Sequence, residues 1–286
     1  MSAKKPLFVF FGTPDLSVCV LEALAAHGQL PALVVTAPPQ PKGRGLVLTP
    51  TPVAAWAAER GIDTLTPKKL DQDFVDMLAN SDWDVFVVAM YAKLLPKQVL
   101  DLPRRGTLNV HPSLLPKFRG PSPVLSAILA DERTTGVTIM QLTEKMDAGP
   151  IVAQARIEVD EDTGQGGWPP KGSEFEIFLA TEGGNLLAET LGPWVAGDIP
   201  AEPQDESAAT YTKKFAPEDA LIDPAGDPRT QLLKIRAFDK SPRAHFFQNG
   251  KRFIVTDATV EAGVLKILRV IPEGKKETDY QNVIHT

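Results

Sequence analysis

The chain is poor in the residues that bind metal ions or form covalent cross-links. Its 286 residues include a single cysteine, Cys19, and four histidines. One cysteine excludes an intrachain disulfide and is typical of a protein of the reducing cytoplasm. Scattered histidines with one cysteine do not have the spacing of a metal-ligand cluster, so we expect no metal site.

Long apolar runs are also missing near the start of the sequence. Lysines occupy two of the first six positions, and only the five apolar residues 7–11 precede Gly12. That stretch is too short for the core of a signal peptide or for a membrane span, and neither end has a lipidation motif. We therefore expect a soluble cytoplasmic protein without a membrane partner. Separately, we expect a monomer.

The chain has fewer basic than acidic residues, 30 Lys and Arg against 36 Asp and Glu. The formal net charge of −6 argues against a general nucleic-acid binder. Residues 206–286, however, hold 13 Lys and Arg against 11 Asp and Glu, whereas residues 1–205 hold 17 against 25. This mildly basic C-terminal part is weak evidence for an anionic partner that contacts mainly this part.

The first two-thirds of the sequence alternates apolar strand patterns with helical ones. Continuous apolar runs such as 7–11 are typical of central parallel strands that are buried on both faces. The alternation predicts a doubly wound, Rossmann-like α/β domain. The predicted strands are 7–11, 33–36, 84–89, 106–111, 136–142 and an edge strand at 151–159; the predicted helices are 16–26, 71–80 and 174–197.

A polar, proline-containing segment after residue 197 is the best candidate for a domain boundary. We expect a catalytic domain over 1–197, a linker over 198–209 and a small C-terminal domain over 210–286. Beyond a short helix near 231–237, strand patterns at 251–256 and 264–270 are separated by a turn-rich segment. They predict a small, shortened β-barrel resembling an OB-fold.

The strand at 106–111 brings two polar side chains together. Asn109 and His111 are two residues apart, so their side chains lie on the same face of the strand, and Pro112 ends it. Ligands of open α/β sheets bind at the carboxyl ends of the strands. There an imidazole moves protons near neutral pH, and an amide donates to a developing oxyanion. From these residues alone, a structural role for His111 stays open.

Asp147 stands before Ala148-Gly149-Pro150, in a tight loop between two predicted strands. A carboxylate at this position would orient His111 or raise its pKa by stabilising the imidazolium. The alternative is a turn aspartate that bonds to its own backbone, which is common for Asp near Gly.

The segment NVHPSLLPKFRGPSPVLSAILADERTTGVTIMQLTEKMDAGPIVAQ, residues 109–154, resembles the signature of the folate-dependent formyltransferases. Shorter matches continue along nearly the whole chain, among them 11–15, 41–45, 87–91, 210–211 and 235–238. The resemblance implies that Asn109, His111 and Asp147 are the catalytic residues and that 10-formyltetrahydrofolate is the formyl donor. It also implies folate contacts from two segments, Val88, Ala89 and Met90 in one and Ser113, Leu114, Leu115 and Pro116 in the other.

The acceptor amine depends on a second set of residues. The loop 37–46 resembles the insertion of the branch that formylates methionyl-tRNA, with Arg44 matching its basic residue and Lys42 as an added charge. Arginine suits a phosphate contact because of its planar fork. Leu46, Val47 and Leu48 stand where that branch usually has lysines.

Three readings follow from the resemblance. The leading one is formylation of the amino group of methionyl-tRNA. The alternatives are a formyltransferase that acts on a sugar-nucleotide amine, and a non-catalytic module that binds folate or RNA. The purine-biosynthesis branch has a single domain and would leave the C-terminal part unexplained.

Overall fold

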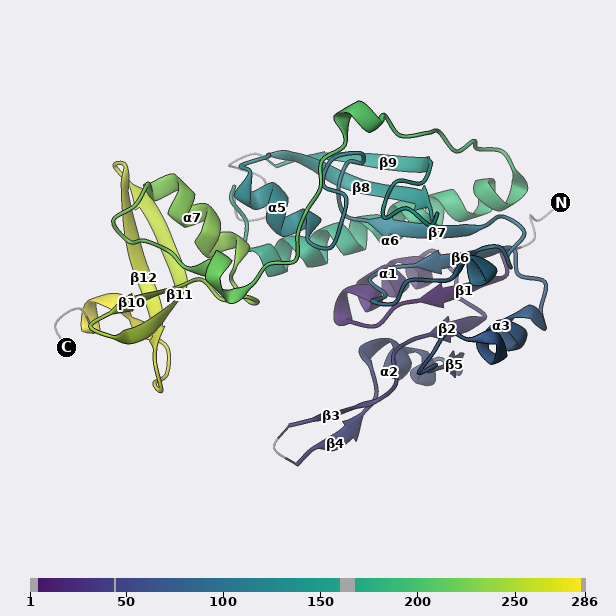
Figure 1. Cartoon of the computed structure of the whole chain (residues 1–286), viewed down its shortest axis with the longest axis horizontal. Helices are drawn as coiled ribbons and strands as arrows, with labels where there is room; N and C mark the ends of the chain where they lie inside the picture. Colours follow the sequence, from purple (N-terminus) through teal and green to yellow (C-terminus); the bar gives the residue numbers. More distant parts are fainter. Residues whose placement is uncertain (1–4, 44, 160–167, 284–286) are drawn as a thin grey trace. The chain divides into compact units, whose positions relative to one another are not determined.

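The computed structural model describes residues 5–43, 45–159 and 168–283. Its largest element is a seven-stranded sheet with the strand order β5-β2-β1-β6-β7-β8-β9 (Figure 1). These strands are β5 (Asp63–Leu65), β2 (Leu33–Val35), β1 (Phe8–Phe11), β6 (Val85–Val88), β7 (Thr107–His111), β8 (Thr134–Gln141) and β9 (Ile151–Glu158). The first five are parallel and β8 is antiparallel to β7. The predicted α/β class is confirmed.

The centre of the sheet is apolar on both faces. Every residue of β1 and β6 is buried, as expected for central parallel strands that are covered on both sides. On one face, Val9 and Phe86 pack against Phe74 and Leu78 of α3 (Gln72–Ala79). At the outer edge, β9 alternates in burial and ends the sheet, which agrees with the predicted edge strand.

The other face is covered by α1 (Asp15–Ala26) and the long α6 (Gly172–Ala196). Two adjacent glycines allow the close approach of α6. A Cβ on Gly183 would lie 2.5 Å from Val110 of β7, and one on Gly184 would lie 2.6 Å from Ala23 of α1. Val110 therefore faces α6, and its neighbours Asn109 and His111 face the opposite side of the sheet.

Between β2 and α2 (Pro52–Glu59), the chain forms a separate two-stranded hairpin, β3 (Gln40–Lys42) and β4 (Val47–Thr49) (Figure 1). The sequence analysis treats this segment as a loop, and that expectation is wrong. Most of the hairpin's described residues are exposed. Little apolar burial supports the hairpin, and among the strands that the structure describes, β3 and β4 pair only with each other.

The chain divides into two compact units. The first comprises residues 1–119, 136–156 and 177–210, and the second 120–135, 157–176 and 211–286. The second unit thus includes two segments that the sequence analysis places in the catalytic domain. The boundary at 198–209 stays a prediction.

The second unit contains an antiparallel sheet with the order β10-β11-β12-β13. Its strands are β10 (His245–Gln248), β11 (Lys251–Glu261), β12 (Val264–Pro272) and β13 (Thr278–Asp279). Helix α7 (Pro228–Ala237) packs against β11, β12 and the short α5 (Pro123–Leu129). A further short helix, α4 (Lys97–Leu100), lies in the first unit. In the part of the chain that the structure describes, no helix is both long and apolar enough to cross a membrane.

Candidate active site

The candidate site lies where β6 and β7 end side by side. Val88, the last residue of β6, pairs with Asn109 of β7, and His111 pairs with Thr138 of the antiparallel β8. The pairing places the half-buried Asn109 beside the end of β6. The carboxyl ends of two parallel strands thus bring an amide and an imidazole to one edge, where open α/β sheets bind ligands.

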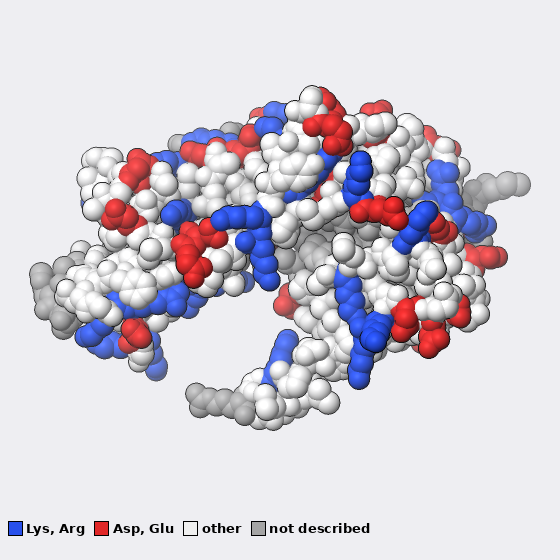
Figure 2. All heavy atoms as spheres, viewed as in Figure 1, with Lys and Arg blue, Asp and Glu red and all other residues white. Residues whose placement is uncertain are grey.

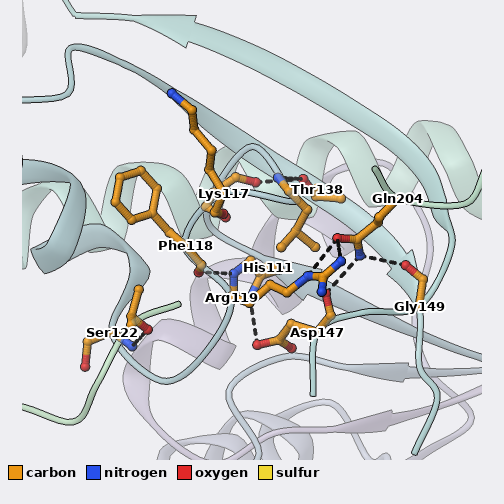
Figure 3. Close-up of polar contacts among 12 residues, drawn as sticks. His111, Lys117, Phe118, Arg119, Ser122, Thr138, Asp147, Gly149 and Gln204 are labelled. Carbon is orange, nitrogen blue, oxygen red and sulfur yellow. Dashed lines mark hydrogen bonds and ion pairs between the residues drawn. The ribbon is translucent and has the colours of Figure 1, made fainter. Parts of the chain in front are cut away.

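His111 is buried, with 4% of the residue exposed, and its ring has a different neighbour at each nitrogen. Nε2 lies 3.0 Å from the carbonyl oxygen of Phe118, and Nδ1 lies 3.8 Å from Oδ2 of Asp147 (Figure 3). A carbonyl oxygen only accepts hydrogen bonds, so Nε2 bears the ring hydrogen. In the neutral ring, Nδ1 is then a free base on the side of Asp147.

The environment of His111 favours that neutral form. Burial lowers the pKa of His111 below its usual range, and this effect outweighs the opposing effects of the Asp147 carboxylate and the Phe118 carbonyl. The separation of 3.8 Å exceeds hydrogen-bond distance, so Asp147 acts on the ring through its charge. The imidazole is therefore neutral at pH 7, with a counter-charge in place for a proton that it accepts.

The backbone of Asp147 has an unusual conformation. Its φ of +49° lies in the left-handed region, which costs a non-glycine residue about 1 kcal/mol and is most accessible to Asp and Asn. Two further residues near the site have the same left-handed backbone: Phe118 (φ +61°), in the loop after β7, and Met90 (φ +50°), which follows β6. Such strained residues concentrate at functional sites.

The predicted folate residues fall into two segments with different burial. Val88 and Ala89 are buried and Met90 is half-buried at the end of β6. In the loop after β7, Leu114 and Pro116 are half-buried.

The other two residues of that loop have structural contacts. Ser113 is buried and its hydroxyl donates to the Lys117 carbonyl at 2.7 Å. Leu115 is buried and its N–H donates to Thr138 Oγ1 at 3.1 Å. Within this loop, the side chains of Leu114 and Pro116 are therefore better placed than those of Ser113 and Leu115 to meet a ligand.

Of the two predicted tRNA contacts, Arg44 lies outside the described residues. Lys42 ends β3 and is exposed. Leu46, Val47 and Leu48 of the same hairpin are exposed apolar residues.

Arg119 and Gln204 are site residues to which the sequence analysis assigns no role. The Arg119 side chain is fully buried, and Gln204 joins it to the backbone of the Asp147 loop (Figure 3). These residues are 85 positions apart, and a polar linker glutamine gives no sequence signal of such a contact.

Within the described ranges, no three His, Cys, Asp or Glu side chains lie close enough together to hold a metal ion. The polar groups that meet at the strand edge are instead an amide, a neutral imidazole and a carboxylate. This set suits proton transfer coupled to stabilisation of an oxyanion.

Sequence comparison gives the family to which the chain belongs. The profile described as "Formyl transferase" matches residues 4–176. The chain belongs to the formyl transferase family.

Within that family, the chain is similar to the methionyl-tRNA formyltransferases of two bacteria. It is 41% identical to the enzyme of Chloroflexus aggregans over 253 residues, which cover 88% of this chain and 80% of the relative. It is 37% identical to the enzyme of Bacillus subtilis over 275 residues, which cover 93% and 84%.

Solved structures share the fold at low identity. Methionyl-tRNA formyltransferase from Clostridium thermocellum superimposes with a TM-score of 0.60 at 14% identity, covering 93% of this chain and 98% of the other. An N-formyltransferase from Helicobacter canadensis, in complex with folinic acid and dTDP-3-aminofucose, gives 0.65 at 15% identity, covering 89% and 87%. HypX from Aquifex aeolicus, in complex with tetrahydrofolic acid, gives 0.62 at 17%, covering 98% and 47%.

Proposed function

We propose that this protein transfers the formyl group of 10-formyltetrahydrofolate to the amino group of methionyl-tRNA. The observation that most supports formyl transfer is the meeting of Asn109, His111 and Asp147 around the end of β7. The choice of acceptor is supported by relatives of that name at 37–41% identity, of which the chain covers at least 80%.

The positions of the three residues support a separate role for each. Attack of an amine on a formyl carbonyl places negative charge on the carbonyl oxygen and leaves a proton to be removed from nitrogen. The Asn109 amide would donate to that oxygen. Nδ1 of His111 would accept the proton, and the nearby Asp147 carboxylate would stabilise the imidazolium that results. Once charged, His111 would add to the stabilisation of the oxyanion. It would then return the proton to the folate nitrogen as the bond from that nitrogen to the formyl carbon breaks, which would release tetrahydrofolate and the formylated amine.

The residues around the strand ends suit a flat heteroaromatic ring of the folate type. Leu114 and Pro116 offer partly exposed apolar side chains, and the backbone of Val88, Ala89 and Met90 lies at the neighbouring strand end. The bound folate would supply the activated formyl group. Ser113 and Leu115 would shape the loop from within, because both are buried.

We assign recognition of the tRNA to the β3–β4 hairpin, with Lys42 and Arg44, and to the C-terminal unit. In the C-terminal unit, Lys and Arg side chains gather over the β10–β12 sheet (Figure 2). In this unit, Lys214 and Lys251 are exposed, whereas Lys213 pairs with Asp219 and Arg236 with Asp257. The proposal includes an OB-like barrel for residues 210–286 and a monomeric, cytoplasmic enzyme.

The deciding experiment offers the purified protein 10-formyltetrahydrofolate with either methionyl-tRNA or an amino-sugar nucleotide. We expect formyl-methionyl-tRNA as the product, measured by acid-precipitable radiolabel from the formyl donor. Transfer only to the amino-sugar nucleotide would mean that the acceptor is a sugar amine, and formyl transfer would stand as the reaction class. Absence of transfer to either acceptor would favour a binding module.

Arg44→Ala tests the hairpin separately from the chemistry. We expect a higher KM for methionyl-tRNA with kcat little changed, because a phosphate contact acts mainly on binding. Lys68→Ala serves as a control because Lys68 is an exposed lysine of the first unit that lies outside the hairpin. An unchanged KM in Arg44→Ala would return the hairpin to the role of a surface loop.

A further inference from the structure

After α6, the chain continues in the first unit as a strap, defined here as residues Glu202–Thr210, which contains one short 3-10 helix, η1 (Glu206–Ala208). At its start, Glu202 exchanges two backbone hydrogen bonds with Ile151 of β9, at 2.7 and 2.8 Å. At its end, the Thr210 carbonyl accepts from the Arg119 N–H at 2.9 Å, and the Thr210 N–H donates to the Pro116 carbonyl at 3.2 Å. The strap is thus attached at both ends to segments that flank the catalytic residues.

The middle of the strap contacts the Asp147 loop through the side chain of Gln204. Its amide nitrogen donates to the carbonyls of Asp147, at 2.9 Å, and Gly149, at 2.7 Å. Its amide oxygen accepts from Nε and Nη2 of Arg119 at 3.0 and 2.8 Å. Both N–H groups and both lone pairs of the amide are therefore in use, which fixes its orientation.

Arg119 is a rigid anchor for that amide. Its side chain is fully buried, and it also forms a bidentate pair with Glu206 of the strap at 2.8 and 3.0 Å. A buried guanidinium is costly unless its donors are satisfied, so this arrangement resists displacement. The same guanidinium holds the pKa of Glu206 below its usual range, which keeps the pair charged.

We propose that Gln204, held in place by Arg119, is a positioning residue that fixes the Asp147 loop and thereby the distance from the Asp147 carboxylate to His111. The two carbonyls that Gln204 binds bracket the segment from Asp147 to Gly149. The left-handed backbone of Asp147 costs energy, and the two hydrogen bonds to Gln204 help to offset it. The effect of Gln204 on catalysis rests on the proposed formyl transfer. The hydrogen bonds that position the Asp147 loop do not depend on that proposal.

The same strap holds the other neighbour of the imidazole. Thr210 Oγ1 accepts from the Phe118 N–H at 2.8 Å, and the Phe118 carbonyl is the group that Nε2 of His111 contacts. Both groups that surround the ring, the Asp147 carboxylate and the Phe118 carbonyl, are therefore braced by one segment of nine residues. Gln204 acts on the side where Nδ1 accepts the proton.

The test substitution is Gln204→Met, which keeps the length of the side chain and removes its donors. In protein labelled with ¹⁵N-histidine, we expect the pKa of His111 to be lower than in the wild type, because a displaced carboxylate stabilises the imidazolium less. His111→Asn identifies the signal among the four histidines. We also expect kcat to fall about 10- to 100-fold, as for a misplaced catalytic group, with the KM for folate within about threefold.

The matched control is Asp205→Ala. Asp205 is the next residue of the strap, and its carboxylate caps a short turn at Ser207. We expect a wild-type titration of His111 and a kcat within about twofold of the wild type, since a lost surface cap is a small local effect.

A folded Gln204→Met protein with wild-type kcat and an unmoved His111 titration overturns the proposal. If Gln204→Met does not fold, Gln204→Glu keeps the acceptor for Arg119 and removes the donors; wild-type kcat in that variant also overturns it. The titration needs no substrate, so it separates the two proposals. A shifted titration in a protein without formyl transfer would keep the positioning role and remove the proposed reaction.

Discussion

Gly149 lies against the backbone of Gln141 so closely that a Cβ on the glycine would be 1.8 Å from the Gln141 carbonyl oxygen. The loop that holds Asp147 is thus pressed onto the end of β8, where only glycine fits. A methyl group at this position must push the loop and the strand apart.

We therefore expect Gly149→Ala to lower both stability and activity. Overpacking of this kind costs about 1–3 kcal/mol in the free energy of unfolding, and displacement of Asp147 should lower kcat about 10-fold or more. Urea unfolding and steady-state kinetics measure the two effects. Gly192→Ala is the control, because a Cβ there has no heavy atom within 4 Å. If Gly149→Ala and Gly192→Ala have equal stability and equal activity, the close contact between Gly149 and the Gln141 carbonyl is contradicted.

The lowered pKa of His111 makes a prediction about the pH dependence of the reaction. If neutral His111 accepts the proton, kcat/KM should fall as the pH decreases through the pKa of the folded protein. Because burial lowers this pKa, the midpoint should lie below the usual value of about 6.5. A pH-rate profile measures it. A midpoint clearly above that value would mean that the charge of Asp147 prevails over burial.

The same group should make stability depend on pH. The unfolded chain binds a proton at His111 near pH 6.5, whereas the folded protein resists protonation to a lower pH. The free energy of unfolding should therefore decrease as the pH falls below about 6.5, by at most about 1.4 kcal/mol per pH unit from this one group. Urea titrations between pH 5 and pH 8 test this, with those limits set by the ordinary range of histidine. His111→Asn should show a shallower slope; identical slopes would exclude His111 as the cause.

Asn109 and Asp147 should act on turnover more than on binding. We expect Asn109→Ala to lower kcat about 10²- to 10³-fold, because an oxyanion donor acts mainly in the transition state. Asp147→Asn keeps the shape and removes the counter-charge, so it should lower both kcat and the pKa of His111. Kinetics together with the histidine titration distinguish the two roles. A rise in KM alone would make either residue a binding residue.

Tyr91 offers a test of stability away from the catalytic trio. Within the part of the chain that the structure describes, its buried hydroxyl has no hydrogen-bond partner, and burial raises its pKa to about 12. Tyr91→Phe should therefore raise the Tm, since an unsatisfied buried hydroxyl costs about 1–3 kcal/mol. Tyr280→Phe is the control, because that hydroxyl donates to Gln248 at 3.2 Å. A drop in Tm for Tyr91→Phe would indicate a hydrogen bond that holds Tyr91 in solution.

The main features of the fold follow from local patterns in the sequence. The runs at β1 and β6 are apolar because both faces are buried, and such runs are easily read. The sequence analysis missed five strands of two to four residues each: β3, which contains Pro41, β4, β5, β10 and β13. Strands this short have too few residues for an alternation of apolar and polar side chains to be recognised in the sequence.

The candidate site is only partly local. Asn109 and His111 share a face because of the two-residue period of a strand, which the sequence alone predicts. Asp147 joins them through the family resemblance. The contact of Arg119 with Gln204 depends on how a loop and the strap pass each other in space, and no periodicity encodes it.

The position of the strap in the sequence also determines when a newly made chain acquires a complete catalytic site. All seven strands of the large sheet precede residue 159, whereas Gln204 and Thr210 come well after them. A ribosome-bound chain that has released the sheet but not the strap has His111 in its strand without the braces on either side of its ring. Because domains fold as they emerge during synthesis, the catalytic geometry is completed only once residue 210 has emerged, after the whole large sheet.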